Sequence, residues 1–205
     1  PSPPPPPLCQ MALELAIVYD RSGSMWNERY TMRNVLRSVV NQFELGATLT
    51  RVAMVSFAGD ATIHAQLSTD AVLLNGVIDQ YSPGGATSIS RGLADAESIL
   101  TSTTIRSDAA KVVLLFTDGV QSGYLGGDVA AIAAAQGVRE RAGATILALG
   151  FGGAATQTIN ALATPPASAN AYFGASLLDV QSRLSDICTL VHSPSAPPPL
   201  FPAFP

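Results

Sequence analysis

The sequence predicts an α/β domain of doubly wound type, in which helices cover both faces of a mostly parallel central sheet that has one antiparallel edge strand. Short, continuously apolar runs alternate along the chain with longer amphipathic runs, the pattern expected when parallel strands are buried on both faces. Apolar residues make up 47% of the 205 residues, which is enough material for a single sizeable core. We therefore expect one folded domain of ordinary size.

Six apolar runs are predicted to form strands. They span residues 13–19, 51–57, 62–66, 112–116, 145–149 and 171–173. The second and third runs are separated only by a turn at Gly59 and Asp60, so they are expected to pair as an antiparallel hairpin. The remaining strands are each followed by a helical pattern, which favours parallel pairing.

Six segments carry the helical pattern. They span residues 28–45, 69–80, 89–100, 129–141, 156–163 and 177–190. In the first of them, Val35, Leu36, Val39, Val40 and Phe43 recur on one face, and the following Gly46 is a typical helix stop.

Both ends of the chain are rich in proline. We expect residues 1–8 to be a spacer, residues 9–192 to be the domain and residues 193–205 to be a proline-rich tail. Proline favours the extended polyproline II conformation, although simply unstructured ends are the alternative. The run PSPPPPP resembles the hydroxyproline-rich segments of plant and green-algal wall glycoproteins. That resemblance implies a location outside the cell, at its surface or in its wall.

The chain begins with proline and has no recognisable leader, so we expect it to be a fragment of a larger secreted or membrane-anchored protein. The net charge is -4 and only 13% of the residues are charged, so no basic field exists that could attract nucleic acid. No apolar run approaches the roughly 18 to 20 residues needed to cross a membrane. Neither nucleic-acid binding nor membrane insertion is therefore expected of this segment.

The two cysteines, Cys9 and Cys188, lie near the two ends of the predicted domain. They are predicted to form a disulfide that closes the domain, with two free thiols as the alternative. The paired short spacings of a zinc site are absent. A disulfide closing so long a loop would contribute roughly 5 kcal/mol in the chain-entropy model, and it would indicate an oxidising, extracellular setting.

Oxygen-bearing side chains gather where the predicted strands end. Asp20 ends the first strand and begins the run DRSGSM, in which Ser22 and Ser24 alternate with it around a turn. Asp118 follows the fourth strand in the run FTDG, and Thr87 lies on the glycine-rich loop GGATS. Ligands of doubly wound sheets bind at the carboxyl ends of the strands, so we expect these five side chains to form one site.

Two carboxylates and three hydroxyls favour a hard divalent cation. Such oxygen ligands select Mg²⁺, Ca²⁺ or Mn²⁺ and disfavour zinc and copper. A small number of ligands with retained water favours Mg²⁺, with Mn²⁺ or Ca²⁺ as alternatives. Taken singly, Asp20 could instead be a turn residue, and Ser22 or Ser24 could cap the following helix.

Together these motifs resemble the metal-ion-dependent adhesion site of von Willebrand factor type A domains, which has the pattern DxSxS, then threonine, then aspartate. The resemblance extends over residues 13–191 and implies a Rossmann-like fold. It also implies that Ser22, Ser24 and Thr87 bind the metal directly or through water, while Asp20 and Asp118 act partly through water. The metal would then bind a Glu or Asp carboxylate of a protein partner, such as an extracellular-matrix or cell-surface protein.

The resemblance also implies that the final helix, residues 177–190, can shift and change the coordination of the metal. A disulfide from Cys9 to Cys188 would restrain that movement. Trp26 directly follows the DRSGSM run, where it could line the face that binds the partner or pack on the neighbouring loop.

An aspartate at the end of a first strand also serves phosphoryl-transfer enzymes of doubly wound fold. A phosphatase similar to the haloacid dehalogenases needs a second aspartate two positions after Asp20, where this chain has Ser22. The only histidines, His64 and His192, are not expected to meet in a catalytic triad, and no nucleophile or phosphate-loop motif is present, so no enzymatic activity is expected. The alternative is a structural matrix or cell-wall module that self-associates independently of metal.

Overall fold

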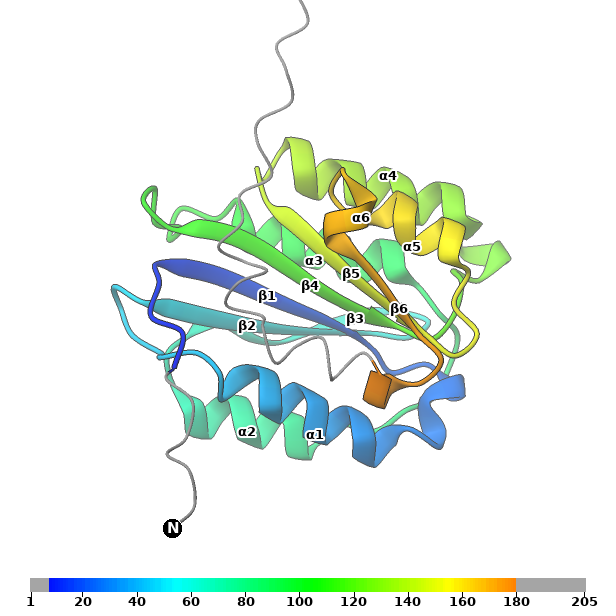
Figure 1. Ribbon diagram of the computed structural model, residues 1–205, viewed down its shortest axis with the longest axis horizontal. Coiled ribbons are helices and arrows are strands. Elements are labelled where there is room, and N and C mark those ends of the chain that lie inside the picture. The colour runs from blue at the N-terminus through cyan, green and yellow to red at the C-terminus, as the bar shows by residue number, and fades with distance from the viewer. Residues whose placement is uncertain (1–7, 180–205) are drawn as a thin grey trace, which may run out of the picture.

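The computed structural model describes residues 8–179, which form one six-stranded sheet with helices on both sides (Figure 1). The strands lie in the order β3-β2-β1-β4-β5-β6. Their bounds are β1 (Leu13–Asp20), β2 (Thr50–Phe57), β3 (Ala61–Ser68), β4 (Ala110–Thr117), β5 (Thr145–Phe151) and β6 (Ala171–Gly174). All neighbouring strands pair in parallel except β2 and β3, which form the predicted antiparallel hairpin at the edge. The predicted fold class is confirmed.

The helices follow the strands as the alternating pattern predicts. They are α1 (Arg29–Val40), α2 (Ala71–Asp79), α3 (Ile89–Leu100), α4 (Gly127–Glu140), α5 (Thr156–Leu162) and the short α6 (Ala167–Asn170). Two 3-10 helices, η1 (Gly23–Trp26) and η2 (Gly123–Leu125), lie in the loops after β1 and β4. Each of these loops contains residues of the predicted site.

The two faces of the sheet carry separate apolar cores. Helices α1 and α2 cover one face, and helices α3, α4 and α5 cover the other (Figure 1). Alternate residues of β1 serve the two cores, so that Leu15 and Ile17 belong to the first and Ala16 and Val18 to the second. Because every residue of β1 is buried, this strand reads as a continuous apolar run apart from Glu14 and Asp20.

The strand order changes direction between β1 and β4, which lie side by side at the centre of the sheet. Their register pairs Tyr19 with Phe116, so both strands reach the same edge at Asp20 and Thr117. Asp118 follows directly. Ligands of open α/β sheets bind at such a switch point, because the connections on its two sides lead to opposite faces and leave a crevice.

The predicted end of the first helix was wrong by five residues. Helix α1 ends at Val40, not at residue 45 before Gly46. After Val40 the backbone pairs with the chain around Cys9 instead of continuing as a helix: Cys9 N–H donates to the Gln42 carbonyl at 2.7 Å, and Glu44 N–H donates to the Cys9 carbonyl at 3.0 Å. A contact between segments so distant in sequence overrides the local helical pattern.

Several predictions fall on residues that the structure does not describe. They concern the proline-rich segment before Leu8, the tail 193–205, most of the helix at 177–190, and Cys188. Cys9 itself is buried, with 3% of its surface exposed. The disulfide from Cys9 to Cys188 and the boundaries of the domain at residues 9 and 192 stay predictions. Over residues 8–179, no helix has both the length and the apolar character needed to cross a membrane.

Candidate metal centre

Asp20 is fully buried at the end of β1, where three different segments hold it. Its Oδ1 accepts a hydrogen bond from the Ser22 backbone N–H at 2.7 Å, and its Oδ2 accepts one from the Thr117 hydroxyl at 2.8 Å. The Tyr81 hydroxyl donates to the Asp20 carbonyl oxygen at 2.8 Å. The bond to Ser22 closes a local turn, so Asp20 is also a turn residue. Both carboxylate oxygens are fixed in direction.

Ser22, Ser24 and Asp118 form a continuous chain of oxygen atoms next to Asp20. The hydroxyl oxygens of Ser22 and Ser24 lie 3.0 Å apart, and the Ser24 hydroxyl donates to Asp118 Oδ1 at 2.8 Å. Ser22 precedes η1 but makes no side-chain capping bond, and the N-cap position of α1 is held by Glu28, which makes none either. Ser22 thus occupies the N-cap position of η1 without a side-chain capping bond, and the two serine hydroxyls bond to each other and to Asp118 instead.

The loop that carries Thr87 is attached to both of the other segments. Gly23 N–H donates to the Gly85 carbonyl at 2.9 Å, and Gly84 N–H donates to the Arg21 carbonyl at 2.7 Å. Thr87 bonds on its other side to the loop after β4, since its N–H donates to the Ser122 hydroxyl at 3.2 Å. Gly85 has a φ of +90°, a conformation that favours glycine. The loop thus bridges the DRSGSM and FTDG segments, and all five predicted residues lie on three connected loops.

The two carboxylates of the site have no basic partner. Burial raises the pKa of Asp20 to about 6, against hydrogen bonds from Ser22 and Thr117 that lower it, and the charge of Asp118 raises it further. Burial also raises the pKa of Asp118. Over residues 8–179, neither carboxylate forms an ion pair with lysine or arginine. Two neighbouring acids without an internal cation make a site that binding of an external cation would stabilise.

The donor set fits a hard cation that binds hydroxyl groups. The described part of the chain contains no group of three or more His, Cys, Asp or Glu side chains that could hold a metal. Any metal here must therefore take hydroxyl and water ligands beside its one or two carboxylates, as Mg²⁺ does in proteins. The oxygen atoms of Ser22, Ser24 and Asp118 already converge within hydrogen-bond distance of one another, so the residues present fit such an ion.

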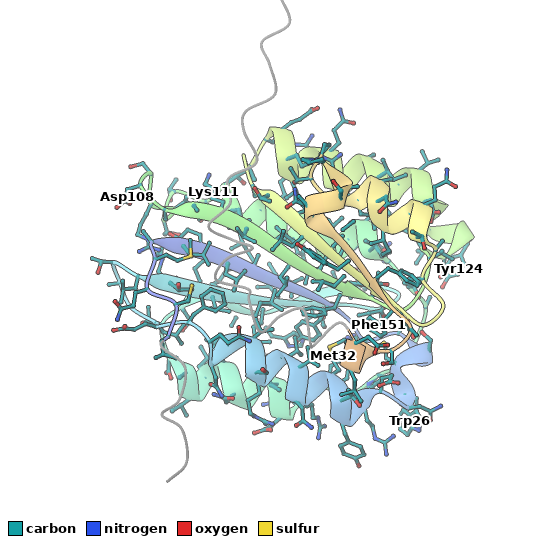
Figure 2. The ribbon with its side chains drawn as sticks, in the orientation of Figure 1. Trp26, Met32, Asp108, Lys111, Tyr124 and Phe151 are labelled. Carbon is teal, nitrogen blue, oxygen red and sulfur yellow. The ribbon has the colours of Figure 1, made fainter. Side chains whose placement is uncertain are left out.

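Exposed aromatic side chains lie at the same end of the molecule. Trp26 is 55% exposed and Tyr124 is 80% exposed, and Figure 2 shows both beyond the carboxyl ends of the strands. The Arg29 guanidinium lies 5.0 Å from the centre of the Trp26 ring and donates to the Trp26 carbonyl at 2.8 Å. Trp26 is thus an exposed side chain at the end of the molecule that carries the site, and its part in a binding face stays a prediction.

Sequence reasoning missed the residues that support the five predicted ones. Thr117 and Tyr81 hold Asp20 in place, and the Ser122 hydroxyl holds the Thr87 backbone. Thr117 could have been found, because it is a polar residue that ends an apolar strand directly before Asp118. Tyr81 could not, because 61 residues separate it from Asp20 and only the fold brings them together.

Comparison with known families decides the relationship. The family model of the von Willebrand factor type A domain matches residues 14–185. The chain belongs to this family. No protein with curated annotation matches it in sequence.

Solved structures agree with this assignment. Proximal thread matrix protein 1 from the mussel byssus, with a zinc-occupied MIDAS motif, is 26% identical with a TM-score of 0.76; the match covers 89% of this chain and 46% of the mussel chain. This chain thus spans about half the length of that protein. The von Willebrand factor domain of a type V pilus tip protein from Porphyromonas gingivalis is 13% identical, with a TM-score of 0.76 and coverage of 89% and 95%. The manganese-loaded TRAP protein of Plasmodium vivax is 18% identical, with a TM-score of 0.68 and coverage of 90% and 73%.

Proposed function

We propose that this chain is a non-enzymatic adhesion module that binds a protein partner through a divalent cation. The observation that carries the proposal is the chain of oxygen atoms from Ser22 through Ser24 to Asp118, beside the buried Asp20, at the switch point of the sheet. The site offers oxygen ligands and negative charge, and it has no basic group of its own to neutralise that charge.

The five residues divide into ligands and positioning groups. Ser22, Ser24 and Thr87 supply neutral hydroxyls, and Asp118 supplies a carboxylate that is partly exposed. Asp20 is fully buried and already accepts two hydrogen bonds, so it orients the Ser22 backbone and contributes charge. A bound Mg²⁺ with mostly neutral ligands would supply an electrophilic position that a Glu or Asp carboxylate of a partner can occupy.

The surface around the site suits a protein partner. Trp26, Tyr30 and Tyr124 are exposed aromatic side chains close to it in sequence, and aromatic residues are enriched in protein interfaces. His64 bonds to Ser56 across the edge hairpin at 2.8 Å, and within residues 8–179 no hydrogen bond joins either side chain to the five residues of the site. Binding is therefore proposed in place of catalysis.

We propose Mg²⁺ as the ion and the outside of the cell as the location. The similar mussel and Plasmodium proteins hold zinc and manganese respectively. Zinc therefore belongs in any titration, although an oxygen-only donor set favours harder ions. The resemblance to a thread matrix protein and the proline-rich ends support a place in an extracellular matrix or cell wall.

The experiment is a titration of metal-stripped protein with Mg²⁺, Mn²⁺, Ca²⁺ and Zn²⁺, followed by thermal unfolding. An ion that binds only the folded state should add about 2.7 kcal/mol to the free energy of unfolding at 100 times its Kd. Asp118→Ala should abolish the rise. Asp108→Ala is the matched control, because Asp108 is exposed and lies at the opposite end of the molecule (Figure 2). An equal rise in both variants would place the ion elsewhere.

The similarity to a matrix protein favours one second candidate, a structural module that self-associates without metal. Sedimentation velocity with and without chelator separates the two functions. Assembly that persists after chelation supports the structural module. Metal-dependent binding to peptides that carry Asp or Glu supports adhesion.

The proposed disulfide provides a further test of how the domain is regulated. If a bridge from Cys9 to Cys188 restrains the final helix, the Cys188→Ser variant should bind an acidic partner with changed affinity. Equal affinity of this variant and the wild type would contradict the restraint.

A further inference from the structure

We propose that a pocket beside the metal centre binds a small oxyanion, such as sulfate, phosphate or a carboxylate group, with Arg21 as its main ligand. The proposal goes beyond the adhesion function and does not depend on it. The pocket is lined by Tyr19, Ser56 and His64 from three adjacent strands and by Val77 and Gln80 at the end of α2. Figure 1 shows that α2 covers the same face of the sheet as α1.

The pocket has a closed base and an open mouth. Tyr19, Ser56 and Tyr81, which form its base, are buried, whereas Gln80 and Ser82 at its mouth are exposed. Its volume is about 110 Å³, several times the roughly 10–15 Å³ that one water molecule needs on the same measure. A small anion can therefore fit into the pocket and reach it from solvent.

Arg21 is the one cationic side chain of the described residues that has no protein acceptor. Its Nε is buried and makes no hydrogen bond. Every other arginine of residues 8–179, and Lys111, donates a side-chain hydrogen bond to a carbonyl or carboxylate. A buried guanidinium N–H without a partner is unfavourable, so this group is expected to bind an acceptor that the chain itself does not supply.

The neighbouring acid cannot fill that role. Both carboxylate oxygens of Asp20 are directed to Ser22 and Thr117 in the metal centre, so the carboxylate next to Arg21 in sequence does not occupy the pocket. The polar groups that line the pocket beside Arg21 include Ser56, His64, Gln80 and Ser82. Ser56 and His64 bond to each other at 2.8 Å, which leaves one donor of this pair for an anion. These groups can donate hydrogen bonds to an oxyanion, and an arginine fork matches the planar or tetrahedral arrangement of its oxygens.

The test follows anion binding at Arg21 itself. Sulfate is titrated into metal-stripped, nitrogen-15-labelled protein at constant ionic strength, and the Nε–H cross-peak of Arg21 is monitored by NMR. The expected result is a saturable shift of this cross-peak. In parallel, sulfate affinity is measured calorimetrically in Arg21→Gln, where it should fall by about tenfold or more, because a charge-assisted hydrogen bond is lost.

Two variants keep the test decisive. Arg37→Gln removes the same charge from an exposed ion pair with Asp79 and should leave sulfate affinity unchanged. Arg21→Lys keeps the charge and should retain weakened binding even if Arg21→Gln folds poorly. Since sulfate stabilises folded proteins generally, a non-saturable effect of equal size in Arg21→Gln and Arg37→Gln would overturn the proposal.

Methyl sulfate and inorganic sulfate separate the two sources of the anion. Binding of both indicates that an oxyanion attached to a larger molecule can enter through the mouth at Gln80 and Ser82. Binding of inorganic sulfate alone indicates a free ion. If neither inorganic sulfate, phosphate nor acetate shifts the Arg21 cross-peak, the pocket is not an anion site.

Discussion

At the amino-terminal end of β1 the buried carboxylate of Glu14 lies between two arginines, whereas at the carboxyl-terminal end of the same strand the buried carboxylate of Asp20 has only hydroxyl and amide partners. Arg51 Nε donates to Glu14 Oε2 at 2.9 Å, and Arg106 Nε donates to Glu14 Oε1 at 2.9 Å. Both carboxylates are fully buried, so burial alone does not distinguish them.

The two carboxylates differ in the direction in which their pKa values are shifted. Burial by itself would raise the pKa of Glu14, but the hydrogen bonds from Arg51 and Arg106 bring it below its usual value. Burial raises the pKa of Asp20 to about 6, and within residues 8–179 no ion pair opposes this rise. The same strand therefore has one acid neutralised within the fold and one acid left without a counter-charge. The second arrangement suits an ion that comes from outside.

The largest expected effect on stability is at Glu14, the acid at the amino-terminal end of β1 that two arginines neutralise. Glu14→Gln should lower the free energy of unfolding by about 3 kcal/mol, because it leaves Arg51 and Arg106 partly buried without a counter-charge. Urea denaturation measures the change. The control is Asp79→Asn, which breaks the exposed pair with Arg37 and should cost less than about 1 kcal/mol. Equal costs for the two variants would contradict the special role of Glu14.

The next effect is the pH dependence of the metal-free protein. The pKa of Asp20 in the folded protein, about 6, lies above the value of 3.8 for the free side chain, so the folded state binds more protons between these values. This group therefore destabilises the metal-free protein progressively as pH rises from about 4 to about 6, by on the order of 2 kcal/mol.

Saturating Mg²⁺ should offset this loss, so the rise in melting temperature that Mg²⁺ produces should grow between pH 4 and pH 7. The comparison is made with Asp20→Asn, which lacks the titrating group. A Mg²⁺ effect that is independent of pH in the wild type would indicate that the ion does not bind beside Asp20.

The variant Asp20→Asn tests whether the buried charge at the carboxyl-terminal end of β1 destabilises the metal-free protein. In metal-free protein at pH 7 this variant should be as stable as the wild type or more stable by up to about 2 kcal/mol, since it removes a buried charge that has no counter-charge. It should also lose most of the stabilisation by Mg²⁺. Chemical denaturation with and without the ion measures both effects. A loss of stability like that of Glu14→Gln would mean that the two ends are not different.

The smallest expected effect is that of Thr117→Val, which keeps the shape of the side chain and removes the hydroxyl that donates to Asp20 Oδ2. The cost to stability should be about 1 kcal/mol, a usual value for one hydrogen bond. Mg²⁺ affinity should fall modestly, because Asp20 loses one of its two positioning bonds. Isothermal calorimetry measures the affinity, and Thr101→Val, which removes a hydroxyl at the exposed end of α3, serves as control.

Much of this structure could be predicted because local patterns and the fold agree. Helix α3 spans the residues that periodicity predicts, and β5 begins where its apolar run begins. The five predicted site residues lie on three loops that bond to one another, because the carboxyl ends of parallel strands meet at one edge. The end of α1 was missed because the residues that follow it, Gln42 and Glu44, pair with the chain at Cys9, which lies far away in sequence.

The sequence by itself determined the class of fold and the oxygen-rich chemistry of the site, because alternating hydrophobicity and side-chain type are local properties of the chain. The tertiary structure decided which buried carboxylates have a cationic partner. Only the fold placed Arg51 and Arg106 against Glu14 and left Asp20 without an ion pair among residues 8–179. Only the fold placed Arg21 at a pocket in which its buried Nε has no acceptor. Electrostatic interactions depend on distance and burial in space, and neither can be read along the chain.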